Sequence, residues 1–214
     1  MLYIDLQYFP CVNYIATLCK EREVDFQLDL PFRKSSFRNR MIIAGAGGPI
    51  PLSIPIIGSR SNKLPYDQIQ IDNKATWQRD HFRTLVAAYG NSPFFFHYRD
   101  EIESLFAQKT ELLYEWNMIC LNWILQKLKL DEKIIITECA SLDRQDIKDL
   151  SDMITPANYK TQQPILKYTQ VFEDRVGFLA NLSSLDLLLN VGPDAQKNLI
   201  ELFGKFSLFK QPNS

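Results

Sequence analysis

The stretch LYIDLQYFPCVNYIATLCKE, residues 2–21, decides the fold that we expect for this chain. It starts as a short apolar strand, turns at Phe9 and Pro10, and continues as an amphipathic helix. The next stretch, VDFQLD at residues 24–29, alternates apolar and polar residues like a strand with one buried face. Because a helix between two strands returns the chain in the same direction, we expect these strands to pair in parallel.

An antiparallel hairpin is predicted after this unit. Two apolar runs, residues 41–44 and 52–57, flank the glycine-rich sequence AGAGGPI. A glycine-rich turn is also typical of dinucleotide-binding loops, but there the turn opens a helix whose amides hold a pyrophosphate. Pro49, Pro51 and Pro55 prevent such a helix here, so the pattern favours a hairpin turn.

The rest of the chain mixes helical patterns with short strands. DQIQID at residues 67–72 predicts a further strand, and Asp72 or Asn73 is placed to cap the helix that follows. The later expected elements are a helix from Ser92, a long helix at 110–130 and a buried strand at 133–140.

These elements predict an α/β fold: a mostly parallel, Rossmann-like sheet flanked by helices, with an antiparallel hairpin insertion at about 38–72. A helical segment is expected at about 74–129, and C-terminal helices at about 182–206. With 214 residues, 46% of them hydrophobic, the chain suffices for a single domain over residues 1–214. The polar segment 141–168 has weak periodicity and is expected to be the least regular part.

Composition excludes several classes of function. Twenty-four Lys and Arg residues balance 25 Asp and Glu residues, so no overall field attracts nucleic acid or an anionic membrane. No apolar run approaches the roughly 20 residues needed to cross a bilayer, and no signal peptide is seen. We therefore expect a soluble cytoplasmic protein without membrane insertion.

The cysteines and histidines indicate neither a metal nor a cofactor. The four cysteines show no CxxC spacing and lie in apolar segments, which predicts buried free thiols in a reducing compartment. No HExxH motif and no Cys and His ligand pairs occur, so a bound metal is not expected. The cysteines are Cys11, Cys19, Cys120 and Cys139.

A short basic cluster, FRKSSFRNR at residues 32–40, is the first candidate for ligand binding. Guanidinium groups present paired donors that match phosphate or carboxylate, and Arg38 and Arg40 face one side if their segment is extended. Asn39 lies between them. The alternative is a solvated loop with ordinary surface arginines, and the cluster is too short for a nucleic-acid surface.

His81 is the second candidate. It lies within a predicted helix beside Asp80, where an imidazole can act as a general base or bind a ligand. A lone helical histidine is more often structural, and both roles stay open.

Four stretches resemble the WbqC-like family. They are QYFPCVNYIATL (7–18), DFQLDLPFRKSSFRNRMI (25–42), IQIDNKATWQRDHFRTLVAAYGNSPFF (69–95) and YTQVFEDRVGFLANLSSLDLLLNVGP (168–193). This bacterial family is often encoded with O-antigen and surface-polysaccharide genes. The resemblance implies a role in surface-polysaccharide biosynthesis and, as a reaction, acyl or aminoacyl transfer to an amino sugar.

The resemblance also implies a set of site residues. It gives weight to Gln7, Tyr14, Arg38, Asn39 and Arg40 as ligand contacts and to His81 as the general base. The arginines would hold a small anionic substrate, such as a nucleotide sugar or an acyl donor. Asp186 also matches the family pattern, but its place in the first turn of a helix explains it without a ligand.

Two departures from the family support an alternative function. The opening motif lacks the family's proline directly after Gln7 and has Asn13 in place of its glycine, and residues 151–168 contain no glycine where the family has a glycine-rich segment. The alternative is a non-catalytic binding or assembly protein, which predicts a broad apolar surface near residues 93–96 or 202–209. A third hypothesis is that a nucleotide binds at the amides of the opening turn. The turn lacks the histidines that HxGH nucleotidyltransferases use.

Overall fold

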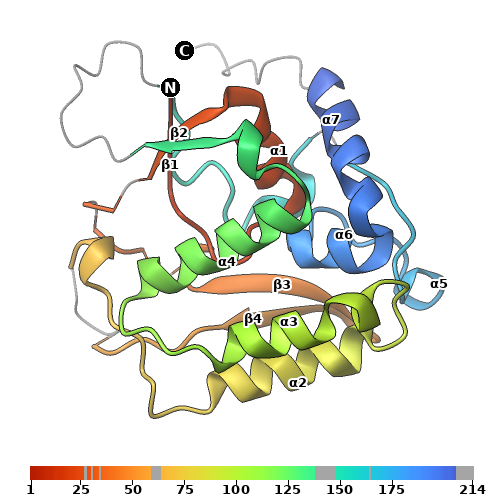
Figure 1. The fold of residues 1–214 in the computed structure, drawn as a ribbon, viewed down its shortest axis with the longest axis horizontal. Coiled ribbons are helices and arrows are strands. Elements are labelled where there is room, and N and C mark those ends of the chain that lie inside the picture. Colours follow the sequence, from red (N-terminus) through yellow and green to blue (C-terminus); the bar gives the residue numbers. More distant parts are fainter. Residues whose placement is uncertain are drawn as a thin grey trace.

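The computed structural model describes residues 1–26, 28–29, 31–33, 35–58, 64–137, 148–163 and 165–205, with residue 137 and the last four as backbone only. Figure 1 shows the arrangement of its helices and strands.

A parallel sheet forms around the opening unit, as predicted. Its strand order is β5-β2-β1-β6, and each neighbouring pair is parallel. Helix α1 connects β1 to β2, and the turn before α1 holds Phe9 at a φ of 37°. The strands are β1 (Leu2–Ile4), β2 (Glu23–Phe26), β5 (Ile135–Thr137) and β6 (Lys148–Asp149), and the helix is α1 (Val12–Glu21).

The glycine-rich stretch forms the predicted hairpin. Strands β3 (Arg40–Gly45) and β4 (Gly48–Ser53) pair in antiparallel register, and Gly45 lies opposite Gly48. Gly48 has a φ of 120°, a conformation that side chains disfavour, so glycine is required at this turn. The turn opens no helix, which agrees with the prediction that it is not a dinucleotide loop.

Helices cover the sheet and the hairpin. In Figure 1, α4 crosses between the parallel sheet and the hairpin, while α2 and α3 run together on the other side of the hairpin. Helix α7 packs against α1, and α6 contacts both α1 and β3. The helices are α2 (Trp77–Tyr89), α3 (Phe95–Ala107), α4 (Leu113–Lys127), α5 (Glu173–Val176), α6 (Ser184–Val191) and α7 (Ala195–Lys205).

The strand predicted at residues 67–72 is wrong. A short 3-10 helix, η1 (Tyr66–Gln68), occupies its start, and the rest forms only isolated bridges to Ile56 and Leu112. Ile69 and Ile71 are buried as the alternation requires, but neither neighbouring segment extends far enough to continue a ladder. The helix after it begins at Trp77 with Thr76 as its N-cap, later than the predicted cap at residues 72–73.

The cysteine prediction is confirmed for the described residues. Cys11, Cys19 and Cys120 are buried and free, and Cys139 lies outside the described residues. Across the described ranges, no helix has the length and apolar character required to span a membrane.

Candidate anion-binding site

The candidate site lies where the parallel strands end. Asp5 and Gln7 follow directly after β1, and Asp152 follows β6, the neighbour of β1 in the sheet. Because all strands run in the same direction, their carboxyl ends meet at one edge, which is where open α/β sheets bind ligands.

Two arginines hold one carboxylate at this edge. The Nη1 atom of Arg38 donates to Oδ1 of Asp152 at 3.1 Å, and Nη1 of Arg33 lies 2.8 Å from Oδ2. Arg38 is almost fully buried, with 2% of its side chain exposed, whereas Arg33 is 69% exposed. The Arg38 guanidinium also lies 5.9 Å from the centre of the Tyr66 ring. We call Arg33, Arg38 and Asp152 the arginine fork.

The buried carboxyl group of Asp5 holds the backbone of Asp152 in the fork. Asp5 accepts a hydrogen bond from the Asp152 backbone amide at 3.1 Å and another from Nε2 of Gln7 at 3.0 Å. The Tyr14 hydroxyl donates to the backbone oxygen of Asp5 at 2.9 Å. Burial raises the pKa of Asp5, and the nearby Arg38 guanidinium partly offsets this effect. Three predicted residues, Gln7, Tyr14 and Arg38, therefore meet around Asp5.

Polar atoms in this cluster are left without partners. Gln7 Oε1, Arg38 Nε and Asn117 Oδ1 are buried and have no hydrogen-bond partner within the described part of the chain. Each unsatisfied buried group costs about 1–3 kcal/mol. The cluster therefore retains unpaired donor and acceptor atoms, and these atoms are closed to solvent in this structure.

A covering segment, which we define as residues 148–163, closes over the cluster. Besides supplying Asp152, it accepts from Nε2 of Gln7 at Ile154 O (3.3 Å) and from Nδ2 of Asn13 at Gln162 O (3.3 Å). Part of this segment is where the sequence lacks the family's glycines. Its backbone oxygens therefore occupy the side-chain amides of Gln7, which is a predicted ligand residue, and of Asn13, which is not.

The other two predicted residues of the basic cluster bind the hairpin. Nδ2 of Asn39 donates to the backbone oxygen of Ile54 at 3.0 Å, and Nε of Arg40 donates to Oγ of Ser53 at 3.1 Å. These contacts fix the start of β3 to the end of β4. Ligand binding by Asn39 and Arg40 stays a prediction.

His81 lies in an aromatic part of the core. It is 6% exposed, its Nδ1 lies 3.0 Å from the Tyr8 hydroxyl, and its ring packs edge-on against Trp77. Burial lowers the pKa of His81 to about 4, so the imidazole is neutral near pH 7. The backbone of Ser53, the residue whose hydroxyl binds Arg40, also contacts it. A role as general base stays a prediction.

The amides at the start of α1 are occupied. Val12 N donates to Leu182 O at 3.0 Å, and Asn13 N donates to Oδ1 of Asn181 at 2.8 Å. The expectation that these amides can bind an anion is therefore wrong, because the protein itself satisfies them. This removes the structural basis for nucleotide binding at the opening turn.

Asp186 belongs to a separate buried network. It accepts hydrogen bonds from the Tyr89 hydroxyl at 2.7 Å, the Tyr168 hydroxyl at 2.6 Å and Nε2 of Gln170 at 2.9 Å. Burial raises the pKa of Asp186, and these donors lower it in part. The network ties α2 to the chain before α6, which explains this aspartate without a ligand.

The apolar surface expected near residues 93–96 is not broad. Phe95 is buried, Phe94 is half-buried against the core, and Phe96 alone of the three is exposed. Side chains from residue 202 onward lie outside the described residues.

Asp5 and Asp152 are the site residues that the sequence did not reveal. The position of Asp5 directly after the first strand was an available signal, because strand ends carry ligand contacts in this fold class. Asp152 lay in a segment without periodicity and carried no comparable signal. Among the residues described, no group of three or more His, Cys, Asp and Glu side chains is arranged to hold a metal ion.

The chain is therefore an α/β protein with an open parallel sheet and with polar groups gathered at the carboxyl edge of that sheet. The chain matches the WbqC-like protein family over residues 7–162, and it belongs to that family. The fourth resembling stretch, at 168–193, lies beyond this match. No curated protein and no solved structure matches the chain.

Proposed function

We propose that this protein acts in surface-polysaccharide (O-antigen) biosynthesis and binds an anionic small molecule, such as a nucleotide sugar or an acyl donor, at the arginine fork. The observation that carries the proposal is the carboxylate of Asp152 between Arg33 and Arg38. A carboxylate held by two guanidinium groups is the geometry by which arginines bind the phosphate or carboxylate of a ligand. Family membership supports the pathway, and acyl or aminoacyl transfer to an amino sugar is the reaction proposed.

Calorimetric titration tests this proposal. Wild-type protein is titrated with UDP-N-acetylglucosamine and with acetyl-coenzyme A, alongside Arg33→Ala and the matched control Arg79→Ala. Arg33 and Arg79 are both exposed and each lies near an aspartate, so neither substitution removes a core group. The expected result is binding that Arg33→Ala weakens about tenfold, a loss of about 1.4 kcal/mol, and that Arg79→Ala leaves unchanged. Equal binding by both variants contradicts the proposal.

A second candidate function is a non-catalytic binding protein. The observation that favours it is that Asp152 already pairs with both arginines of the fork, while the covering segment occupies Gln7 and Asn13. The two functions differ in turnover. Binding of the nucleotide sugar without any transfer to an added amino sugar and acyl donor supports the second candidate, and product formation supports the enzyme.

A further inference from the structure

The buried arginine of the fork is closed to solvent. Arg38 has 2% of its side chain exposed, and its Nη1 atom donates to the same carboxylate that pairs with Arg33. An anionic ligand at the fork needs the guanidinium groups that Asp152 already binds. The ligand and Asp152 therefore compete, and the part of the chain that carries Asp152 has to move before a ligand contacts Arg38.

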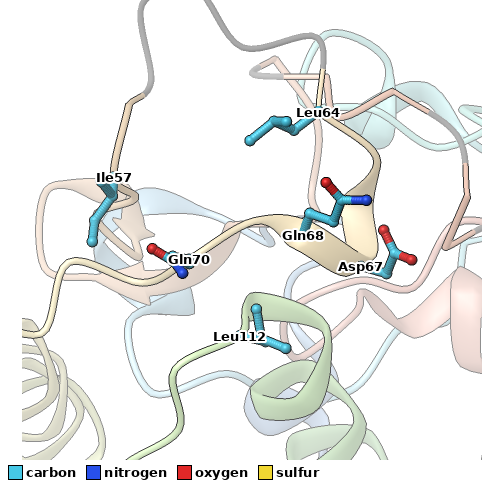
Figure 2. A pocket seen from close by; sticks show the side chains of 6 residues that line it. All are labelled: Ile57, Leu64, Asp67, Gln68, Gln70 and Leu112. Carbon is cyan, nitrogen blue, oxygen red and sulfur yellow. The ribbon is translucent and has the colours of Figure 1, made fainter.

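Two surface pockets lie elsewhere and do not include the fork. One has a volume of about 460 Å³ and lies beside η1 (Figure 2), and the other has a volume of about 450 Å³ and lies beside α5. Among the described residues that line these pockets, none belongs to the fork or to the covering segment. Access to Arg38 therefore depends on the covering segment.

The covering segment consists of two parts that differ in burial. Residues 148–153 are all exposed or half-buried, and we call them the strap. Residues 154–163, which we call the anchor, include Ile154 and Tyr159, which are 3% and 4% exposed. The Tyr159 ring also packs edge-on against Phe37. Only the strap can leave without exposing core side chains to water.

The strap is attached by a short edge strand and by Asp152. It begins with β6, a strand of two residues at the edge of the sheet. Leu150 N donates to Tyr3 O at 2.9 Å, and Asp152 N donates to Oδ1 of Asp5 at 3.1 Å. Asp152 has a φ of 53°, which is uncommon for residues other than glycine, and release of the strap relieves this conformation. Segments with few buried apolar contacts are the ones that open most easily.

We propose that the strap is autoinhibitory: Asp152 occupies the place of the ligand's anionic group, and the strap is released when an anion binds the arginine fork. The anchor keeps its place, so residues 148–153 move about a fixed point at Ile154. This regulation rests on the proposed binding of an anion at the fork. The closed form excludes weakly bound anions, because a ligand has to replace both ion pairs of Asp152.

Hydrogen exchange of the full chain without ligand tests what holds the strap. Asp152→Asn removes the charge and keeps the size of the side chain. We expect exchange at the Leu150 amide to become about tenfold faster in this variant. Exchange at the Tyr159 amide, which donates to Thr155 O within the anchor at 3.0 Å, is expected to stay unchanged. Equal acceleration at both amides would mean that the strap does not open separately, and it overturns the proposal.

A second variant and a control accompany this measurement. Arg33→Ala removes a side chain that is 69% exposed, so it leaves the core intact, and it is expected to make exchange at Leu150 about twofold faster. Asp100→Asn makes the same chemical change as Asp152→Asn on the exposed surface of α3 and should have no effect. Thermal unfolding checks that each variant is folded. Unchanged exchange at Leu150 in the folded variants overturns the proposal.

Inorganic pyrophosphate then tests the competition with Asp152. Its binding is measured by calorimetry, and saturation of the wild type is expected to make exchange at Leu150 about tenfold faster, whereas binding to a closed site slows exchange. Sodium chloride at the same ionic strength shows how much of the change is due to screening. Exchange that is unchanged, slowed, or accelerated equally by sodium chloride overturns the proposal. Absence of pyrophosphate binding by both the wild type and Asp152→Asn overturns it too.

The strap and the proposed function fail separately. If pyrophosphate releases the strap while UDP-N-acetylglucosamine does not bind, the proposed function is overturned and the strap is supported. If the nucleotide sugar binds in a manner that depends on Arg33, but exchange at Leu150 does not change, the strap is overturned and the proposed function is supported.

Discussion

At the scale of single residues, Arg38 holds the candidate site together. Its side chain is 2% exposed, and it joins Asp152 on the covering segment to the Tyr66 ring on η1. Its backbone oxygen also accepts from Nδ2 of Asn117 on α4 at 2.5 Å. A buried guanidinium requires such partners, because an unpaired buried charge is strongly destabilising.

Replacing Arg38 by methionine tests this structural role. Arg38→Met leaves Asp5 and Asp152 without their buried counter-charge, and we expect it to lower the free energy of unfolding by about 2–4 kcal/mol. Urea denaturation measures the change. Arg79→Met, which removes one member of an exposed ion pair, is the control and is expected to change stability by less than about 0.5 kcal/mol. A loss no larger than that of the control would contradict the role given to Arg38.

His81 makes a prediction about pH. Its pKa is lowered from 6.5 to about 4 in the folded protein, so between these values the unfolded chain binds more protons than the folded one. Stability due to His81 is therefore present above pH 6.5 and is lost as the pH falls toward 4. The loss is about 2–3 kcal/mol.

The comparison with His81→Phe isolates this effect. The raised pKa values of Asp5 and Asp186 act in the opposite sense, since their contribution is full at low pH and is lost as the pH rises. Wild-type protein and His81→Phe both contain these aspartates, so the difference between their pH dependences of stability reports on His81. We expect wild-type protein to lose more stability than His81→Phe as the pH falls from 6.5 to 4 in chemical denaturation. If both proteins lost the same stability as the pH falls, the imidazole would be accessible to solvent and protons in the folded protein.

At the scale of elements, the start of α1 shows how distant parts of the chain complete a local motif. The helix has no side-chain cap of its own, since its N-cap residue is Cys11. Asn181, 168 residues from Asn13 in sequence, supplies the missing acceptor at 2.8 Å and donates to Tyr159 O at 2.9 Å. Its φ of 55° is one that asparagine tolerates better than most residues.

Substitutions at Asn181 separate the two effects. Asn181→Gly keeps the backbone conformation and removes the hydrogen bonds, with an expected cost of about 1–2 kcal/mol. Asn181→Ala adds strain at positive φ, so its cost should be larger by about 1 kcal/mol. Hydrogen exchange at the Asn13 amide should become faster in both variants. Unchanged exchange would mean that the Asn181 side chain does not cap α1.

Elements specified by residues close together in the sequence were predictable, whereas features that depend on distant contacts were not. The opening unit, the hairpin and the long helices are specified by local periodicity and by glycine and proline, and each was predicted from the sequence. The strand prediction for residues 67–72 failed because the alternation of apolar and polar residues reflects burial of Ile69 and Ile71 and not continuous pairing with a neighbouring strand. Asp152 was missed because its role depends on contacts with Asp5 and Arg38, more than a hundred residues away.

At the scale of the whole molecule, charge is balanced overall and separated locally. The chain carries a formal charge of −1, yet two arginines converge on Asp152 at the sheet edge. The converging guanidinium groups are what the proposed binding of an anionic small molecule requires.

The most direct test of the central claim is the affinity of Asp152→Asn for UDP-N-acetylglucosamine, measured by calorimetry beside the wild type. If Asp152 lies where the anionic part of a ligand binds, removing its charge frees the fork, and we expect binding to become at least about tenfold tighter. Thermal unfolding of the same sample checks that the variant is folded. Unchanged or weaker binding by folded Asp152→Asn would contradict the claim that the arginine fork is an anion-binding site.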